Sequence, residues 1–160
     1  MVYRIRTILY ATDLGSLERE TFRHAAGLAQ QFGAKIYIVH ALEPIGEFAH
    51  SLLENYLSPE AQENLHQEGF AKVREELRAR LSSFCADELK ANVEETACEI
   101  RLIEGRPAQV ILDEAKRVGA DLIVLGSHGK SALGEMLMGS VAHKVTMKAT
   151  VPVLLVPIQE

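Results

Sequence analysis

The sequence predicts an α/β fold in which helices cover both faces of a parallel sheet. Three observations support this prediction: short apolar runs alternate with helical patterns, most of these runs are apolar at nearly every position, and turn residues separate them. A strand that is apolar throughout is buried on both faces, as in parallel sheets. Strand–helix alternation with right-handed crossovers then gives three layers: helices, sheet and helices.

Five short runs rich in Ile, Val, Leu and Tyr are the predicted strands. They are Thr7–Ala11, Lys35–Ala41, Cys98–Ile103, Asp121–Gly126 and Val151–Val156. The third run alternates apolar and polar residues, which favours an edge position in the sheet. In the last run, Pro152 lacks an N–H and limits the hydrogen bonds that this strand can make with a neighbour.

Helical patterns lie between these runs. They cover Ser16–Phe32, Glu60–Leu89, the segment that starts at Pro107, and Ser140–Ala149. Gly33 and Gly119 are natural stops for the first and third helix, and Pro107 suits a first helical turn. The second helix carries an apolar stripe made of Leu65, Phe70, Val73, Leu77, Leu81 and Phe84. Residues 43–60 form a long link that is helical only in part.

Length and composition indicate one globular domain, residues 1–160. Hydrophobic residues make up 48% of the chain and charged residues 24%, which is ordinary for a domain with a sizeable core. The net charge of −5 argues against nucleic acid and anionic membranes as partners, because both require a basic surface.

The sequence also favours a cytoplasmic location without membrane insertion. No apolar stretch approaches the roughly eighteen residues of a membrane-spanning helix, and the first apolar run is too short for a signal peptide. Cys85 and Cys98 are too few for a disulfide framework or a metal quartet, so a reducing compartment is expected.

In such a sheet, ligands bind beyond the carboxyl ends of the strands, at the point where the strand order reverses. The residues at this edge are Asp13, His40–Glu43, Glu104–Arg106, Gly126–Gly129 and the loop that continues to Ser140. They are therefore the candidates for a binding site.

The segment from Gly126 to Ser140 is rich in glycine, and we weighed three explanations: a phosphate cradle, a flexible loop, or tight turns without a ligand. Glycine reaches positive φ without steric cost and lets a ligand approach the backbone. A helix that begins near Ser140 would add unpaired N–H groups and a partial positive charge. Together these features predict an anion site, to which His128 and Lys130 could add charge.

Two better-known phosphate motifs do not fit this loop. The tripeptide Gly129–Ser131 suggests a P-loop, but the position that needs its first glycine is Val124. The dinucleotide-binding pattern also fails, because no glycine stands two residues before Gly126.

The spacing that does hold is Gly126, two residues, Gly129, nine residues, Gly139 and Ser140. With an Asp13 that ends the first strand, "VHAL" after the second, "EGRPAQVI" after the third and a closing "VPVLLVP", the chain resembles the ATP-binding subgroup of the universal stress protein family along nearly its whole length. The resemblance implies a five-stranded parallel sheet of order 3-2-1-4-5, in the Rossmann-like class.

The resemblance also implies a nucleotide site. Asp13, with Ala11 and Thr12 beside it, would face the ribose and phosphates, Ala41 would meet the adenine through its backbone, and Leu125 would lie near the adenine or ribose. The phosphates would be held, largely through backbone N–H groups, by Gly126, His128, Gly129, Gly139, Ser140 and Val141. The family often has Pro at the position of Ala11 and Ser at that of Gly15, so the start of the first helix departs from its pattern.

Simpler interpretations remain for several of these residues. Asp13 could cap the first helix, and His40 fits a packed strand end better than a ligand. No set of side chains has the spacing of a metal site; Mg²⁺ or Mn²⁺ carried by the phosphates of ATP is more plausible. The loop residues Leu133 and Met136–Met138 suit core packing or a dimer contact.

The apolar last strand, Val151–Val156, needs a cover if it lies at the sheet edge, and the family's usual dimer pairs these strands. We therefore predict a homodimer, and a nucleotide-dependent regulatory or stress-response protein that acts on a further, unidentified protein partner. The chain lacks the motifs of adenylylating enzymes, so no catalytic residue is assigned. The alternatives are a slow ATPase or autophosphorylating enzyme, an interaction module without a nucleotide, and a site for another adenine nucleotide such as AMP or cAMP.

Overall fold

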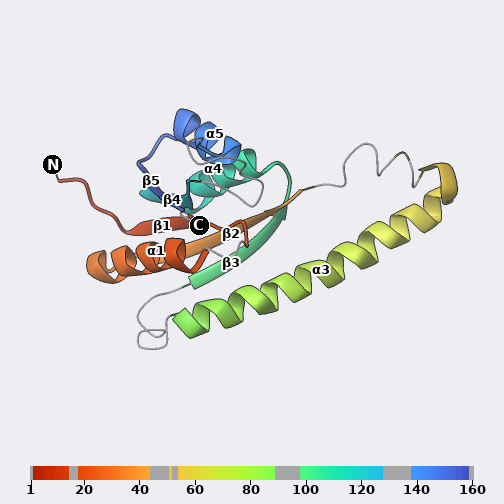
Figure 1. Cartoon of the computed structure of the whole chain (residues 1–160), viewed down its shortest axis with the longest axis horizontal. Helices are drawn as coiled ribbons and strands as arrows, with labels where there is room; N and C mark the ends of the chain where they lie inside the picture. The colour runs from red at the N-terminus through yellow and green to blue at the C-terminus, as the bar shows by residue number, and fades with distance from the viewer. Residues whose placement is uncertain are drawn as a thin grey trace.

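The computed structural model describes residues 2–14, 18–43, 51, 54–88, 98–127 and 138–158. Strands and helices alternate along the chain as the sequence predicts (Figure 1). The elements are β1 (Thr7–Ala11), α1 (Glu18–Phe32), β2 (Lys35–Leu42), α3 (Pro59–Glu88), β3 (Cys98–Glu104), α4 (Pro107–Val118), β4 (Leu122–Gly126), α5 (Ser140–Lys148) and β5 (Val153–Val156).

The strands form one five-stranded sheet with the order β3-β2-β1-β4-β5, and all neighbouring pairs are parallel. This confirms the predicted topology and the edge position of β3. The prediction for β5 was wrong at its start, because Val151 and Pro152 precede the strand. Pro152 has no N–H to give to the ladder, although its carbonyl accepts a hydrogen bond from the amide of Ile123 at 3.0 Å.

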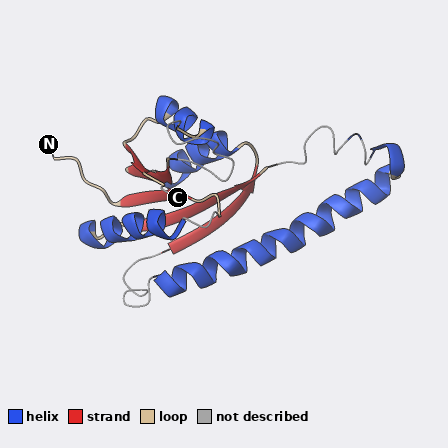
Figure 2. Ribbon diagram, viewed as in Figure 1, coloured by secondary structure: helices blue, strands red, loops and turns tan. Residues whose placement is uncertain are grey.

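Helices lie on both faces of the sheet (Figure 2). Alternate residues of the central strands belong to two separate cores, one on each face. Ile8 and Tyr10 of β1 pack with residues of α1 and α3, whereas Leu9 and Ala11 pack with residues of α4 and α5. This period of two places both faces of β1 in apolar surroundings. The three-layer arrangement expected from the sequence is confirmed.

The predicted helix ends are present in the backbone. Gly33 and Gly119 both have φ of 63°, the left-handed conformation that lets a helix stop without a Cβ clash. The amide of Gly119 returns to the carbonyls of Ala115 and Lys116, which are otherwise unsatisfied at the end of α4. Pro107 occupies the first turn of α4, where no intrahelical N–H is required.

Helix α3 follows the sheet over its C-terminal part only. Leu81 and Cys85 are buried, but Leu65 and Val73 are 53% and 48% exposed, so the predicted stripe does not pack as one face. The 30 residues of α3 span about 45 Å, whereas the eight residues of β2 span about 26 Å. The helix is therefore longer than the strands that it covers, and Figure 1 shows its N-terminal half reaching beyond the sheet. The side chain of Phe70 lies outside the described residues.

Candidate functional site

The carboxyl ends of β1 and β4 meet at the centre of the sheet. Tyr10 pairs with Val124, and continuing this parallel register by two residues brings Thr12 level with Gly126. β2 and β3 lie on one side of β1, and the chain then crosses over to β4 on the other side, so the strand order reverses between β1 and β4. This is the position at which open α/β sheets bind ligands.

Thr12 is held at this edge by three hydrogen bonds. Its amide donates to the carbonyl of Val39 at 3.0 Å, and its hydroxyl oxygen accepts from the amide of Leu14 at 3.0 Å. The His40 ring nitrogen Nδ1 lies 2.7 Å from the Thr12 carbonyl, and this contact requires the proton on Nδ1. His40 is thus a half-buried strand-end residue that orients the β1 terminus, in agreement with the simpler interpretation of this residue.

The chain turns sharply after Asp13. Leu14 has φ of 62°, and it is the one non-glycine residue with positive φ among the described residues. A bulky residue in this region costs about 1–3 kcal/mol, and such strain clusters at functional sites. The turn directs the chain away from β1 directly after the half-buried Asp13. The sequence contains no signal for this strain, because leucine is a poor choice for left-handed backbone.

The interpretation of Asp13 as a cap of the first helix stays a prediction, because α1 is described only from Glu18 onwards. Residues 15–17, between Asp13 and this helix, lie outside the described residues.

The start of α5 forms the other wall of the site. The amide of Gly139 donates to the carbonyl of Ser127 at 2.8 Å, and the carbonyl of Gly139 accepts from the amide of His143 at 2.9 Å. The amide of Ser127 in turn donates to Val156 at 2.9 Å. These bonds bring the α5 N-terminus to the carboxyl ends of β4 and β5.

The first turn of α5 leaves three N–H groups without an intrahelical acceptor, those of Ser140, Val141 and Ala142. No acceptor for them is found in the part of the chain that the structure describes. Ser140 is exposed and Val141 is half-buried, so this turn faces solvent. Unpaired amides and the positive end of the helix dipole together favour an anion.

The hydrogen bonds revise the role of one predicted residue. The amide of Gly139 is already paired with Ser127, so Gly139 cannot supply a donor to a ligand as the sequence analysis expected. Its φ of −57° and ψ of 149° are open to any residue, and Gly126 is not among the glycines with positive φ. The remaining role of Gly139 is steric, because the absence of a Cβ lets a ligand approach the start of α5.

The other predicted site residues differ in what they can offer. Ala11, Thr12 and Leu125 are between 4% and 8% exposed. Ala11 and Leu125 pack in the core, whereas the Thr12 hydroxyl bonds within the turn after β1. Ala41 is half-buried at the end of β2. His128, Gly129 and Lys130 lie outside the described residues.

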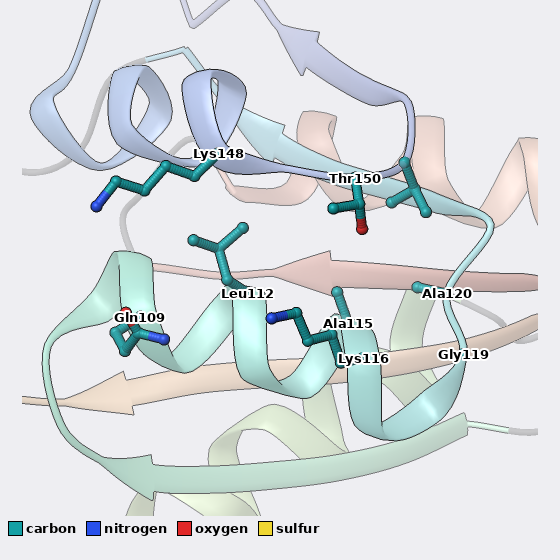
Figure 3. Close-up of a pocket in the computed structure, with 9 residues that line it drawn as sticks. Gln109, Leu112, Ala115, Lys116, Gly119, Ala120, Lys148 and Thr150 are labelled. Atoms are coloured by element: carbon teal, nitrogen blue, oxygen red, sulfur yellow. The ribbon is translucent and has the colours of Figure 1, made fainter.

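A cavity of about 390 Å³ lies elsewhere, between α4 and α5 (Figure 3). Lys116 and Lys148 stand at its border, and Leu112 and Ala115 form part of its wall. Gly119 and Ala120 precede β4, and Thr150 and Val151 precede β5, so this cavity lies at the amino end of the sheet, opposite to the candidate site.

Two features that would indicate other functions are absent from the described residues. These residues contain no group of three or more His, Cys, Asp or Glu side chains arranged for a metal ion. None of the helices in this part of the chain combines the length and the apolar character that crossing a bilayer requires.

Comparison with known proteins places this geometry in context. Residues 4–157 match the model of the universal stress protein family. A universal stress protein of Thermus aquaticus is 35% identical over 151 residues, covering 94% of this chain and 98% of the relative. The structure of MJ0577 from Methanocaldococcus jannaschii superposes with a TM-score of 0.79 at 24% identity and covers 99% of both chains. A universal stress protein in complex with cAMP superposes with a TM-score of 0.63 at 25% identity, covering 96% of this chain and 98% of that protein.

Proposed function

This chain belongs to the universal stress protein family, and from that premise we propose that it binds ATP and acts as a nucleotide-dependent regulatory protein of the stress response. The observation that supports this proposal best is the first turn of α5, where the amides of Ser140, Val141 and Ala142 have no acceptor among the described residues. A polyphosphate would satisfy these donors and the helix dipole at once.

The carboxyl end of β1 suits the ribose. Continuing the β1–β4 register places Thr12 level with Gly126, and Asp13 is the next residue of β1's carboxyl end. In our proposal the Asp13 carboxylate accepts from the ribose hydroxyls, while the main chain near Ala41 meets the adenine edge. The His40–Thr12 hydrogen bond keeps the β1 terminus in place for these contacts.

The side chains at the site also limit how a metal ion could bind there. Asp13 is one carboxylate, and the described residues contain no cluster that would hold a cation without a ligand. We therefore propose that any Mg²⁺ or Mn²⁺ arrives with the phosphates of ATP, because these ions bind phosphate oxygens together with one or two carboxylates.

A second candidate ligand is a cyclic or monophosphate adenine nucleotide. The similar protein in complex with cAMP favours it, since that protein has the same fold and a bound adenine nucleotide with one phosphate. The α5 N-terminus would hold that phosphate by the same amides. The two candidate ligands differ in the number of phosphates that the site binds, so their relative affinities distinguish them.

We also propose a homodimer in the cytoplasm. β5 is the last strand of the sheet, and Val153, Leu154 and Leu155 along it are half-buried. An apolar edge strand of this kind is stabilised by a cover, which a second β5 would supply. An unidentified protein that reads the nucleotide state completes the proposed regulatory role.

The proposal is tested by denaturing freshly purified protein and identifying the released nucleotide by mass spectrometry. We expect ATP, and isothermal titration of stripped protein should then show tighter binding of ATP than of AMP or cAMP. Gly139→Val should abolish this binding without unfolding the protein, because φ of −57° and ψ of 149° suit valine while its side chain enters the phosphate space.

Two controls decide the mechanism. Lys130→Ala should weaken binding only modestly, since the donors are main-chain amides, and Gly27→Val at a helix surface should leave it unchanged. If Lys130→Ala removes ATP binding and Gly139→Val does not, the proposal that main-chain amides hold the phosphates is wrong. ATP turnover that Asp13→Asn abolishes, with binding retained, would instead identify an ATPase.

A further inference from the structure

The cavity between α4 and α5 is built from the last turns of both helices and the segments that follow them (Figure 3). Lys116 and Lys148 lie in these last turns, and Thr150 and Val151 precede β5. The volume of about 390 Å³ falls within the roughly 300–1,000 Å³ of pockets that bind small molecules. The site proposed for the nucleotide lies at the other end of the sheet, so it does not account for this cavity.

The inner wall of the cavity is apolar. Ala115 and Ala120 are 9% and 6% exposed, and the half-buried Leu112 and Val151 pack against the same core. Figure 3 shows the side chains of Leu112 and Ala115 directed from α4 towards α5. A wall of this kind suits the hydrocarbon part of a ligand, because contact with it removes apolar surface from water.

The rim of the cavity is positively charged. Lys116 and Lys148 are both exposed, and neither forms an ion pair with a carboxylate of the described residues. The described residues that line the cavity include no Asp or Glu. Two ammonium groups thus border an apolar wall without a counter-charge from the lining.

The carboxylates nearest in sequence have other partners. Asp113 accepts from Nε2 of Gln109 at 2.9 Å, and Glu114 accepts from Nε of Arg117 at 2.9 Å. Asp121 accepts from two backbone amides of the segment that leads into β1, at 2.8 and 3.0 Å. None of these carboxylates is paired with a lysine of the cavity, so both ammonium groups are available to an anion.

A simpler role for the two lysines is to balance the helix dipoles, because both stand in the last turn of a helix. Each helix end is equivalent to about half a negative charge. The two ends together therefore offset about one of the two positive charges. A positive potential remains at the rim, although the whole chain has a net charge of −5.

The available donors favour a carboxylate over a phosphate. Phosphate sites use main-chain amides, but here the Gly119 amide donates to the Lys116 carbonyl at 3.2 Å and the Ala120 amide to the Ala115 carbonyl at 2.9 Å. The side-chain donors are the two ammonium groups and the Thr150 hydroxyl, whose oxygen points towards α4 in Figure 3. Ammonium groups bind carboxylates through charge-assisted hydrogen bonds.

We propose that this cavity is a second ligand site, which binds a small carboxylate with an apolar body, such as a short fatty acid. Lys116 and Lys148 hold the carboxylate, the Thr150 hydroxyl donates to it, and the hydrocarbon lies against Leu112 and Ala115. The site is independent of the proposed nucleotide site, because no residue is common to the two.

Isothermal titration with octanoate tests the ligand class. Octanoate should bind, whereas octylammonium, which has the same chain and the opposite charge, should not. Hexanoate should bind about tenfold more weakly than octanoate, because two fewer methylene groups are buried. The proposal is overturned if octanoate does not bind, or if octylammonium binds equally well.

A pair of double variants tests the location. Lys116→Gln with Lys148→Gln should weaken octanoate binding by more than about tenfold, because both charged donors are lost. Lys72→Gln with Arg80→Gln is the matched control, since it removes the same charge from exposed positions of α3. This control should leave octanoate affinity unchanged. Equal weakening in both double variants would reveal general charge attraction and contradict the proposal.

Competition distinguishes this site from the nucleotide site. Saturating ATP should change octanoate affinity by less than about twofold, and Gly139→Val should bind octanoate as the parent does. Displacement of octanoate by ATP would place both ligands in one site and overturn the proposal. If ATP does not bind at all, but octanoate binds and depends on Lys116 and Lys148, then only the proposed nucleotide function fails.

Discussion

At the scale of single residues, the turn after β3 shows how one glycine joins two elements. Gly105 has φ of 152°, and its amide donates to the Leu42 carbonyl at 2.9 Å, which ties the end of β3 to the end of β2. A Cβ built at this position would lie 2.9 Å from Cγ2 of Val110, a buried residue of α4. Both the backbone and the packing therefore require glycine.

We expect Gly105→Ala to lower the free energy of unfolding by about 1–3 kcal/mol, because alanine is strained at this φ and crowds Val110. Gly27→Ala is the matched control, as Gly27 lies inside α1 with nothing within 4 Å of the added Cβ. That change should raise the free energy of unfolding by up to about 1 kcal/mol. Urea unfolding of both variants measures the difference, and equal effects would contradict the role given to Gly105.

At the scale of elements, one buried carboxylate joins α4 to β3. Glu114 of α4 is 5% exposed, and Nε of Arg117 donates to its two oxygens at 2.9 and 3.0 Å. Arg101 of β3 lies 3.6 Å away on the other side. The hydrogen bond to Glu114 is the main reason why the pKa of the Arg117 guanidinium is raised. Both arginines keep part of their side chains in water, which lessens the cost of burying this charge.

Glu114→Gln should therefore lower the free energy of unfolding by about 1–3 kcal/mol, the range for hydrogen bonds to charged groups. Glu99→Gln removes a second partner of Arg117, but Glu99 is half exposed and its contact is 3.3 Å long. This control should change stability by less than about 1 kcal/mol. Thermal and urea unfolding at neutral pH compare the two, and an equal loss in both would show that burial does not strengthen the Glu114 pair.

At the scale of the whole molecule, the candidate site depends on elements that are far apart in the sequence. Thr12 and His40 come from β1 and β2, while Ser127 and Gly139 connect β4 to α5. The ends of β1 and β2 are held by one set of hydrogen bonds, and the connection from β4 to α5 is held by another. A ligand that contacts both would therefore link two parts of the sheet that meet where the strand order reverses.

Binding at this site should stabilise the whole fold by mass action. At a concentration one hundred times the dissociation constant, ATP should contribute about 2.7 kcal/mol and raise Tm by roughly 5–10 °C. Gly139→Val should keep the Tm of the free protein close to that of the parent and lose this shift. Differential scanning calorimetry with and without ATP gives the measurement, and a full shift in Gly139→Val would contradict the proposed cradle.

Much of the fold could be predicted because the apolar patterns are local. Runs such as Thr7–Ala11, the stops at Gly33 and Gly119, and Pro107 each follow from the conformational preferences of a few residues, and all are present in the structure. The strand order was available through the family spacing and is confirmed. The start of β5 was misplaced because Pro152 removes a donor, although the run Val151–Val156 is apolar throughout.

The candidate site was predictable in position but not in detail. Asp13 and Ser140 could be assigned to one edge of the sheet, because carboxyl ends of parallel strands meet there. That Gly139 gives its amide to Ser127, and that His40 holds the Thr12 carbonyl, depends on distances between segments that no local pattern encodes. The strained backbone of Leu14 could not be predicted from a local pattern either, since only the surrounding packing keeps leucine at positive φ.

By itself, the sequence determined the alternation of elements and the glycine–serine spacing that marks the family, because backbone preference and apolar periodicity act over a few residues. Only the tertiary structure decided which amides of α5 lack a partner among the described residues and which part of the α3 stripe is buried. The physical reason is the same in both cases. A hydrogen bond or an apolar contact needs a partner on the opposite segment, and a helix of 30 residues is longer than the strands that it covers.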